Sequence, residues 1–138
     1  MVEDQPTRVA IVVSEGTFDK AMMAMMLANT AASMGMEVRV FFTFFGLNLL
    51  KKNANPKLGG FYRFFTGVFR NRMAAVKIPA YQEQRQMAMD LGVQLCACST
   101  TMGLMKISKE DMVDGIKILG AGGFLGYASE TQMQFFIG

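Results

Sequence analysis

The sequence contains no histidine, no tryptophan and only two cysteines among its 138 residues. Without histidine it has no Ser-His or Cys-His pair of nucleophile and base, and it lacks the commonest metal ligand. Two cysteines alone do not make a zinc site of four ligands, so no metal and no other cofactor is expected. Any thiol chemistry must therefore use a thiolate that its surroundings stabilise.

Long apolar runs are missing too, although 51% of the residues are hydrophobic and only 18% are charged. The longest candidate for a membrane span, residues 21–36, is interrupted by Asn29, Thr30 and Ser33. The N-terminus, MVEDQPTR, is acidic and has no apolar core of the kind found in signal peptides. We therefore expect a cytoplasmic protein whose cysteines are reduced.

Acidic residues are absent from one third of the chain. Residues 38–82 carry eight basic residues and no acidic one, while the remainder carries six bases against all eleven acids. A basic block on an acidic body predicts a docking surface or an attraction for anions. The block contains no known nucleic-acid-reading motif, so nucleic acid is not an expected partner.

Short apolar runs alternate with helical patterns along the chain. We predict strands at 8–13, 37–43, 93–97, 116–120 and 133–138, and helices at about 17–33, 44–52, 80–92 and 122–130. This order predicts a single α/β domain over residues 1–138, with a five-stranded parallel sheet between helices in a three-layer, flavodoxin- or Rossmann-like architecture. The methionine-rich helix at 17–33 has little polar face, so it is expected to be covered on both sides. Ser108 and Asp111 resemble a capping box.

Residues 53–78 interrupt this alternation as a Phe/Arg-rich insertion. Asn-Ala-Asn-Pro and Gly59-Gly60 are typical of a loop, and FYRFFTGVFRNR follows. Its apolar residues fall on one face of a predicted helix, with Arg63 and Arg70 on the other; they are Phe61, Phe64, Phe65, Val68 and Phe69. The stripe predicts a lid over the thiol or a subunit interface, or alternatively an amphipathic helix in peripheral contact with a membrane.

The two cysteines lie in QLCACSTTMGLMKISKED, one residue apart. In an extended strand they face the same side, and a strain-free disulfide between them is not feasible. Cys96 lies inside the predicted strand and is interpreted as a small buried hydrophobe. Cys98 ends that strand, at the edge where open parallel sheets bind ligands, just before a predicted helix start that would lower its pKa. From the residues alone, Cys98 is equally compatible with an inert core cysteine and with a reactive thiol.

Other residues are candidates for a pocket around Cys98. Ser99, Thr100 and Thr101 supply hydroxyl donors that could hold a sulfur anion or an attached sulfonate, and Met102 could line the pocket. The loop SEGTFD follows a neighbouring strand, so Gly16 and Thr17 are expected at the same sheet edge, with Thr17 also a candidate helix N-cap.

The sequence resembles the DsrE/DsrF-like family. The resemblance rests on IVVSEGTFDKAMMAMMLANTAASMGMEVRVFFTFFGL, on ACSTTMGLMKI and on the tail AGGFLGYASETQMQFFIG, and is nearest to the branch with an AC-x-x-S/T-M-x-x-M segment. It implies the DsrEFH-like form of the fold, small homo-oligomers such as trimers or hexamers, and a working cysteine at Cys98. Cys96 occupies a position that is usually not cysteine. Thr101 replaces the family's serine, and Lys106 replaces a common glycine.

The resemblance also implies a sulfur carrier or sulfurtransferase of intracellular sulfur trafficking. In this hypothesis the Cys98 thiolate attacks a persulfide, thiosulfate or a polythionate, which arrives as a small anion or on a sulfur-carrier protein, and an acceptor thiol then removes the group. One alternative is a non-catalytic oligomeric interaction or membrane-docking protein that uses the Phe/Arg-rich insertion. Another is a thiol redox sensor, for which Cys96 would be a poorly placed resolving residue.

Overall fold

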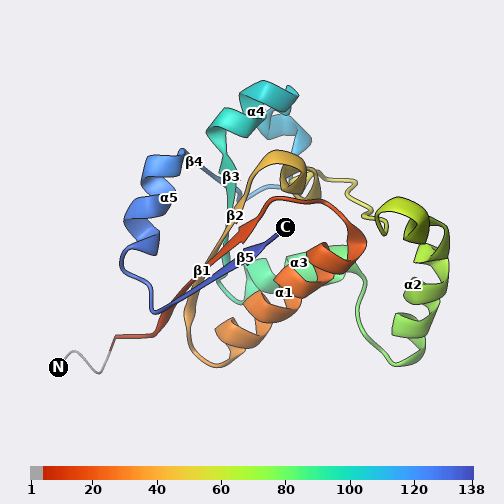
Figure 1. Cartoon of the computed structure of the whole chain (residues 1–138). Helices are drawn as coiled ribbons and strands as arrows, with labels where there is room; N and C mark the ends of the chain where they lie inside the picture. The colour runs from red at the N-terminus through yellow and green to blue at the C-terminus, as the bar shows by residue number, and fades with distance from the viewer. Residues whose placement is uncertain (1–4) are drawn as a thin grey trace.

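The computed structural model describes residues 5–138 and contains one five-stranded sheet (Figure 1). All neighbouring strands are parallel and lie in the order β4-β3-β2-β1-β5. The strands are β1 (Arg8–Val13), β2 (Glu37–Phe42), β3 (Gln94–Cys98), β4 (Lys117–Leu119) and β5 (Met133–Ile137). The prediction of a parallel five-stranded sheet is confirmed, with strand boundaries within about two residues of those expected.

Helices cover both faces of the sheet, so the three-layer α/β class is also confirmed. The larger core lies under α1 (Phe18–Ser33), α3 (Tyr81–Asp90) and the 3₁₀ helix η2 (Phe44–Leu50). The opposite face carries α5 (Ala121–Ala128), and α4 (Ser99–Met105) stands at the end of β3 (Figure 1). The C-terminal edge of the sheet is therefore bordered by η2 and α4.

Strand alternation divides the core between these two faces. Val9, Ile11 and Val13 of β1 belong to the core under α1, whereas Ala10 belongs to the cluster under α5. The α5 cluster is much smaller, and Phe136 beside it is exposed. A thin apolar layer of this kind leaves part of the sheet open to another surface.

The prediction for α1 was wrong in one respect. Met23 is 55% and Met26 is 52% exposed, so the helix is covered on one side and not on both. Met22 and Met25 are buried against the sheet. Methionine occurs on the exposed face of α1 as well as on its buried face. The apolar residues therefore cover more of the helix than the part that packs against the sheet.

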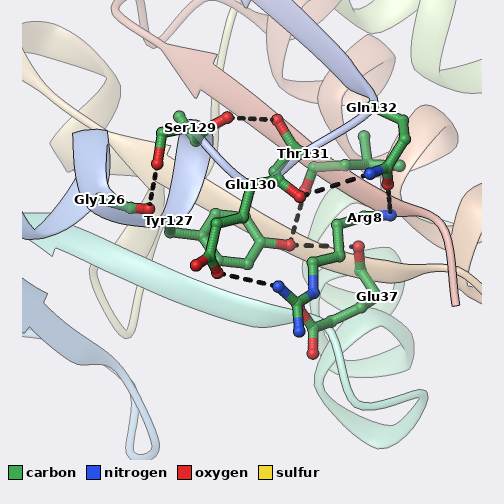
Figure 2. Close-up of polar contacts among 10 residues, drawn as sticks. Arg8, Glu37, Gly126, Tyr127, Ser129, Glu130, Thr131 and Gln132 are labelled. Carbon is green, nitrogen blue, oxygen red and sulfur yellow. Dashed lines mark hydrogen bonds and ion pairs between the residues drawn. The ribbon is translucent and has the colours of Figure 1, made fainter. Parts of the chain in front are cut away.

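Polar contacts attach α5 to the N-terminal edge of the sheet (Figure 2). The Tyr127 hydroxyl contacts the carbonyl oxygens of Val9 at 3.1 Å and Glu37 at 3.2 Å. Arg8 pairs with Glu37 at 3.2 Å and with Glu130 at 2.9 Å. These contacts lie at the end of the sheet opposite Cys98, and we interpret them as structural.

The Phe/Arg-rich insertion forms two helices instead of the single one that its periodicity predicted. The 3₁₀ helix η3 (Gly60–Phe65) is followed by α2 (Thr66–Ala75), which projects to one side of the molecule (Figure 1). The Thr66 hydroxyl donates to the Arg63 carbonyl at 2.8 Å and accepts the Leu58 N–H at 3.0 Å. These bonds tie the helix junction to the preceding loop, which explains the break.

Two local predictions concern helix ends. Ser108 and Asp111 form the predicted capping box. Thr17 occupies the N-cap position of α1 but makes no capping hydrogen bond, and its buried hydroxyl has no partner. None of the helices formed by residues 5–138 is both long and apolar enough to cross a membrane.

Candidate functional site

Cys98 is the last residue of β3 and the N-cap residue of α4. The register of β2 against β3 pairs Phe42 with Ala97, so Thr43 follows β2 beside Cys98. The edge therefore combines the first turn of α4 with a residue that lies 55 positions earlier in the chain. Parallel strands end at the same side of a sheet, which is why such distant residues meet here.

The surroundings of Cys98 favour its thiolate. Burial raises the pKa of the thiol, but four hydrogen-bond donors act against burial and leave the pKa below its ordinary value. The donors are the Thr101 hydroxyl and N–H, the Thr43 hydroxyl and the Thr100 N–H. Hydrogen bonds to the charged form of an ionisable group stabilise that form, so this thiol ionises more readily than a free one.

The two threonine hydroxyls belong to a small network. Thr43 Oγ1 and Thr101 Oγ1 are 3.1 Å apart, and the Phe44 N–H donates to Thr101 Oγ1 at 3.0 Å. Because Thr101 Oγ1 already accepts this bond, its own proton is available for the Cys98 sulfur. Phe44 has a φ of 48°, in the left-handed region that bulky residues rarely adopt. The strained backbone at Phe44 thus points its N–H at the hydroxyl that contacts the thiol.

Cys96 shares a face of the sheet with Cys98 but has a different environment. Both belong to the cluster under α5, and Cys96 is fully buried. Burial raises the pKa of Cys96 to about 11, with the nearby charges of Arg39 and Lys117 lowering it only in part. Cys96 is therefore a poor nucleophile at neutral pH, and the two cysteines differ chemically even though they are neighbours.

Access to the Cys98 sulfur is narrow, because the residue is only 7% exposed. Ser99 and Thr100 are exposed in front of it, Met102 is half-buried, and Thr101 is buried. The four residues after Cys98 that the sequence suggested thus lie in α4, at the same edge. A group that reaches the sulfur has to be slim at its tip.

The structure does not bring Gly16 and Thr17 to Cys98. A Cβ on Gly16 would lie 2.7 Å from the Phe45 carbonyl oxygen, so this turn packs against η2. Gly16 and Thr17 line two shallow hollows that residues 48–69 complete, and Cys98 lines neither. The reason is the strand order, because β2 separates β1 from β3.

A sizeable cavity lies away from Cys98. It has a volume of about 780 Å³ and is lined by α1, α2, the start of α3 and the loop at 52–56. The Phe/Arg-rich insertion thus contributes to a wall beside α1 and α3, on the other side of the molecule from α5 (Figure 1). Among residues 5–138, no three His, Cys, Asp or Glu side chains cluster in a way that could hold a metal ion.

Sequence reasoning missed Thr43 and Phe44. The available signal was a polar residue directly after the strand at 37–42, since the ends of adjacent parallel strands meet at one edge. The sequence pattern instead predicts Thr43 to be the last residue of the strand at 37–43 and Phe44 to begin the helix at 44–52.

Taken together, these features define a class: a three-layer α/β domain with a hydrogen-bonded, acidified cysteine at the carboxyl edge of a parallel sheet. The chain matches the model of the DsrE/DsrF/DrsH-like family at residues 5–60 and 58–136. It belongs to that family.

Two relatives are similar to this chain over nearly its full length. The chain is 30% identical to the Sulfur carrier protein DsrE2 of Allochromatium vinosum, over 94% of this chain and 98% of that protein. It is also 30% identical to the uncharacterized protein YrkE of Bacillus subtilis, over 97% of this chain and 99% of that protein. The resemblance that the sequence suggested is confirmed at the level of the family.

Solved structures agree on the fold. The ychN protein from E. coli superimposes with a TM-score of 0.66 at 12% identity, covering 95% of this chain and 99% of that one. MTH1491 from Methanobacterium thermoautotrophicum, a protein of unknown function, gives a TM-score of 0.63 at 15% identity, covering 94% and 98%. At such identities the likeness concerns the fold alone.

Proposed function

We propose that this protein is a sulfur carrier or sulfurtransferase that accepts a sulfane sulfur or a thiosulfonate group on Cys98 and passes it to an acceptor thiol. The observation that carries the proposal is the set of four donors that lowers the pKa of Cys98 in a chain without histidine. A stabilised thiolate can attack sulfur without a general base. The similarity over nearly the full length to a protein named as a sulfur carrier supports a role in sulfur trafficking.

The proposed step is a thiol–disulfide type of exchange. The Cys98 thiolate attacks the outer sulfur of a persulfide R–S–SH, the S–S bond breaks, and RS⁻ leaves with the electron pair. With thiosulfate the leaving group is sulfite, and the product is again a Cys98 persulfide. With tetrathionate the leaving group is thiosulfate, and the product is a Cys98 S-thiosulfonate. An acceptor thiolate then attacks the sulfur bonded to Cys98 Sγ, the S–S bond breaks, and the Cys98 thiolate leaves with the electron pair, so no external oxidant is needed.

The geometry favours a narrow donor. Because Cys98 is nearly covered, the sulfur must be presented on a slim group, which both a persulfide on a carrier protein and a small sulfur anion provide. We assign the exposed Ser99 and Thr100 and the half-buried Met102 to the entrance, and Thr101 to the thiolate itself. Loaded oxyanions would be held by hydroxyl and backbone donors at this edge.

Assembly into a homo-oligomer, a trimer or hexamer, is part of the proposal. The thin α5 side of the sheet supports it, because Leu125 and Phe136 are exposed there beside the apolar cluster. Exposed apolar surface on a sheet with one covering helix is suited to contact with another subunit.

The redox-sensor alternative has weaker support. A sensor needs a second thiol to resolve the oxidised one, and burial raises the pKa of Cys96 to about 11. Both cysteines are free in the structure. A non-catalytic interaction protein would tolerate serine at position 98 without loss, which separates it from the carrier.

Intact-protein mass spectrometry tests the proposal. The reduced protein is exposed to thiosulfate, tetrathionate and a persulfide donor, with Cys98→Ser and Cys96→Ser beside it. We expect a reducible adduct on the wild type and on Cys96→Ser and none on Cys98→Ser. An adduct that persists in Cys98→Ser, or the absence of any adduct with all three donors, would refute the carrier function.

A further inference from the structure

An exposed aromatic cluster lies on the Phe/Arg-rich insertion, away from Cys98. Phe61 is 71% and Phe64 is 83% exposed, and Tyr62, Phe65 and Phe69 are exposed beside them. The Phe61 ring lies 5.7 to 6.3 Å from the rings of its three aromatic neighbours in η3. Large aromatic side chains in water at the tip of a projecting segment indicate a surface that meets something else.

The insertion that carries the cluster is basic. Residues 53–78 contain five bases and no acid, and four of these bases are exposed: Lys57, Arg63, Arg72 and Lys77. The fifth, Arg70, is half-buried; it donates to the Pro56 carbonyl within the insertion and lies 5.6 Å from the Phe18 ring of α1. The surface combines exposed rings with positive charge, and the contact of Arg70 with Phe18 joins it to α1.

The nearest acids are outside the insertion. Glu15 and Asp19 line a hollow together with Tyr62 and Phe69, and Glu15 is paired with Lys20. Both acids belong to the turn before α1 and to its first turn, and the insertion itself carries only positive charge.

The charge and the position of the insertion favour one binding partner for the aromatic cluster over two others. A second copy of the same surface would bring its four exposed bases against these four, which opposes a symmetric contact. A lid over the thiol does not fit either, because α2 lines the cavity beside α1 and α3, and Cys98 does not. An anionic bilayer complements both features, since Lys and Arg interact with its charge while aromatic rings enter the headgroup region.

We propose that η3 and α2 form a docking surface for an anionic lipid membrane, with Phe61 and Phe64 inserted at the interface and Arg63 and Arg72 among the charges at its surface. Docking would be peripheral and reversible, because the surface is short and one segment supplies all of it. This inference is independent of the chemistry of Cys98.

Vesicle flotation with the full chain tests it. The vesicles are pure phosphatidylcholine, or phosphatidylcholine mixed with phosphatidylglycerol, each at low and at high salt. We expect binding to the anionic vesicles only, weakened by salt. Phe61→Ser/Phe64→Ser and Arg63→Gln/Arg72→Gln should each reduce the partition coefficient about tenfold.

A matched control is provided by Met23→Gln/Met26→Gln, which removes exposed apolar groups from α1 and should bind like the wild type. Cys98→Ser should also bind like the wild type, so failure of the sulfur chemistry would leave this result intact. Circular dichroism of each variant verifies folding.

Absence of binding to anionic vesicles would overturn the proposal, as would unchanged binding of both insertion variants. A lower oligomer mass of Phe61→Ser/Phe64→Ser, with unchanged vesicle binding, would reassign the surface to subunit contact.

Discussion

Thr43 and Thr101 approach each other with their hydroxyl oxygens 3.1 Å apart, although they are 58 residues apart in the sequence. One follows β2 and the other lies in the first turn of α4, and hydrogen bonding by both hydroxyls lowers the pKa of Cys98. Residues from two separate segments of the chain thus lower the pKa of the Cys98 thiol. The chain thus stabilises the Cys98 thiolate with hydrogen bonds and not with a basic side chain beside it.

Thr43→Val should slow the alkylation of Cys98 by iodoacetamide at neutral pH about threefold. Loss of one hydrogen bond to a charged group lowers the thiolate population, while the more basic thiolate is a better nucleophile and offsets part of that loss. The measurement is the pH dependence of the rate in a Cys96→Ser background. Thr43→Ser keeps the hydroxyl and should restore the wild-type profile. An unchanged profile in Thr43→Val would show that this hydroxyl does not act on the sulfur.

The two cysteines should separate clearly in their pH dependence. Because the pKa of Cys98 is lowered and that of Cys96 is raised to about 11, Cys98 should be modified first at every pH below that value. Reactivity of each site rises as pH approaches its own pKa from below, so the curve for Cys98 lies at lower pH. Peptide mapping after brief alkylation measures both sites in one sample. Equal labelling of Cys96 and Cys98 in the folded protein would contradict the assignment.

Lys106→Gly should stabilise the protein by roughly 1 kcal/mol. Lys106 ends α4 with φ 54° and ψ 43°, a left-handed conformation that glycine adopts without strain. The left-handed turn thus forms here with lysine at the position where the resemblance implied a glycine. Urea denaturation measures the difference, with Lys106→Ala as the control that removes the charge and keeps the strain. If alanine stabilises as much as glycine, the charge and not the backbone would be responsible.

Gly16→Ala should destabilise the protein by roughly 1–3 kcal/mol. The new methyl group would lie 2.7 Å from the Phe45 carbonyl oxygen, a backbone atom that moves only together with η2. Gly67→Ala is the matched control, because nothing lies within 4 Å of a Cβ at that position in α2. Alanine there should be neutral or stabilising by up to about 1 kcal/mol. Thermal denaturation of both variants compares them directly, and equal effects would argue against the close contact at Gly16.

Local patterns determined a large part of the fold. The alternation of apolar runs and helical patterns predicted five parallel strands, because a strand buried on both faces needs a continuous apolar run and a crossover helix. The capping box at Ser108 and Asp111 was equally readable, since both partners are three residues apart. The insertion was less readable: its periodicity predicted a single helix with one apolar face, but all residues of η3 are exposed and the bonds of Thr66 divide the segment into two helices.

The sequence by itself determined the class of fold, the family and the position of Cys98 at the end of a strand, since these depend on residues near one another in the chain. Only the tertiary structure decided which distant residues reach the sulfur. Strand order placed β2 beside β3 and so brought Thr43 to Cys98, and the same order kept Gly16 and Thr17 away from it. Burial then separated Cys96 from Cys98, because an ionisable group responds to the solvent and donors around it and not to its spacing in the sequence.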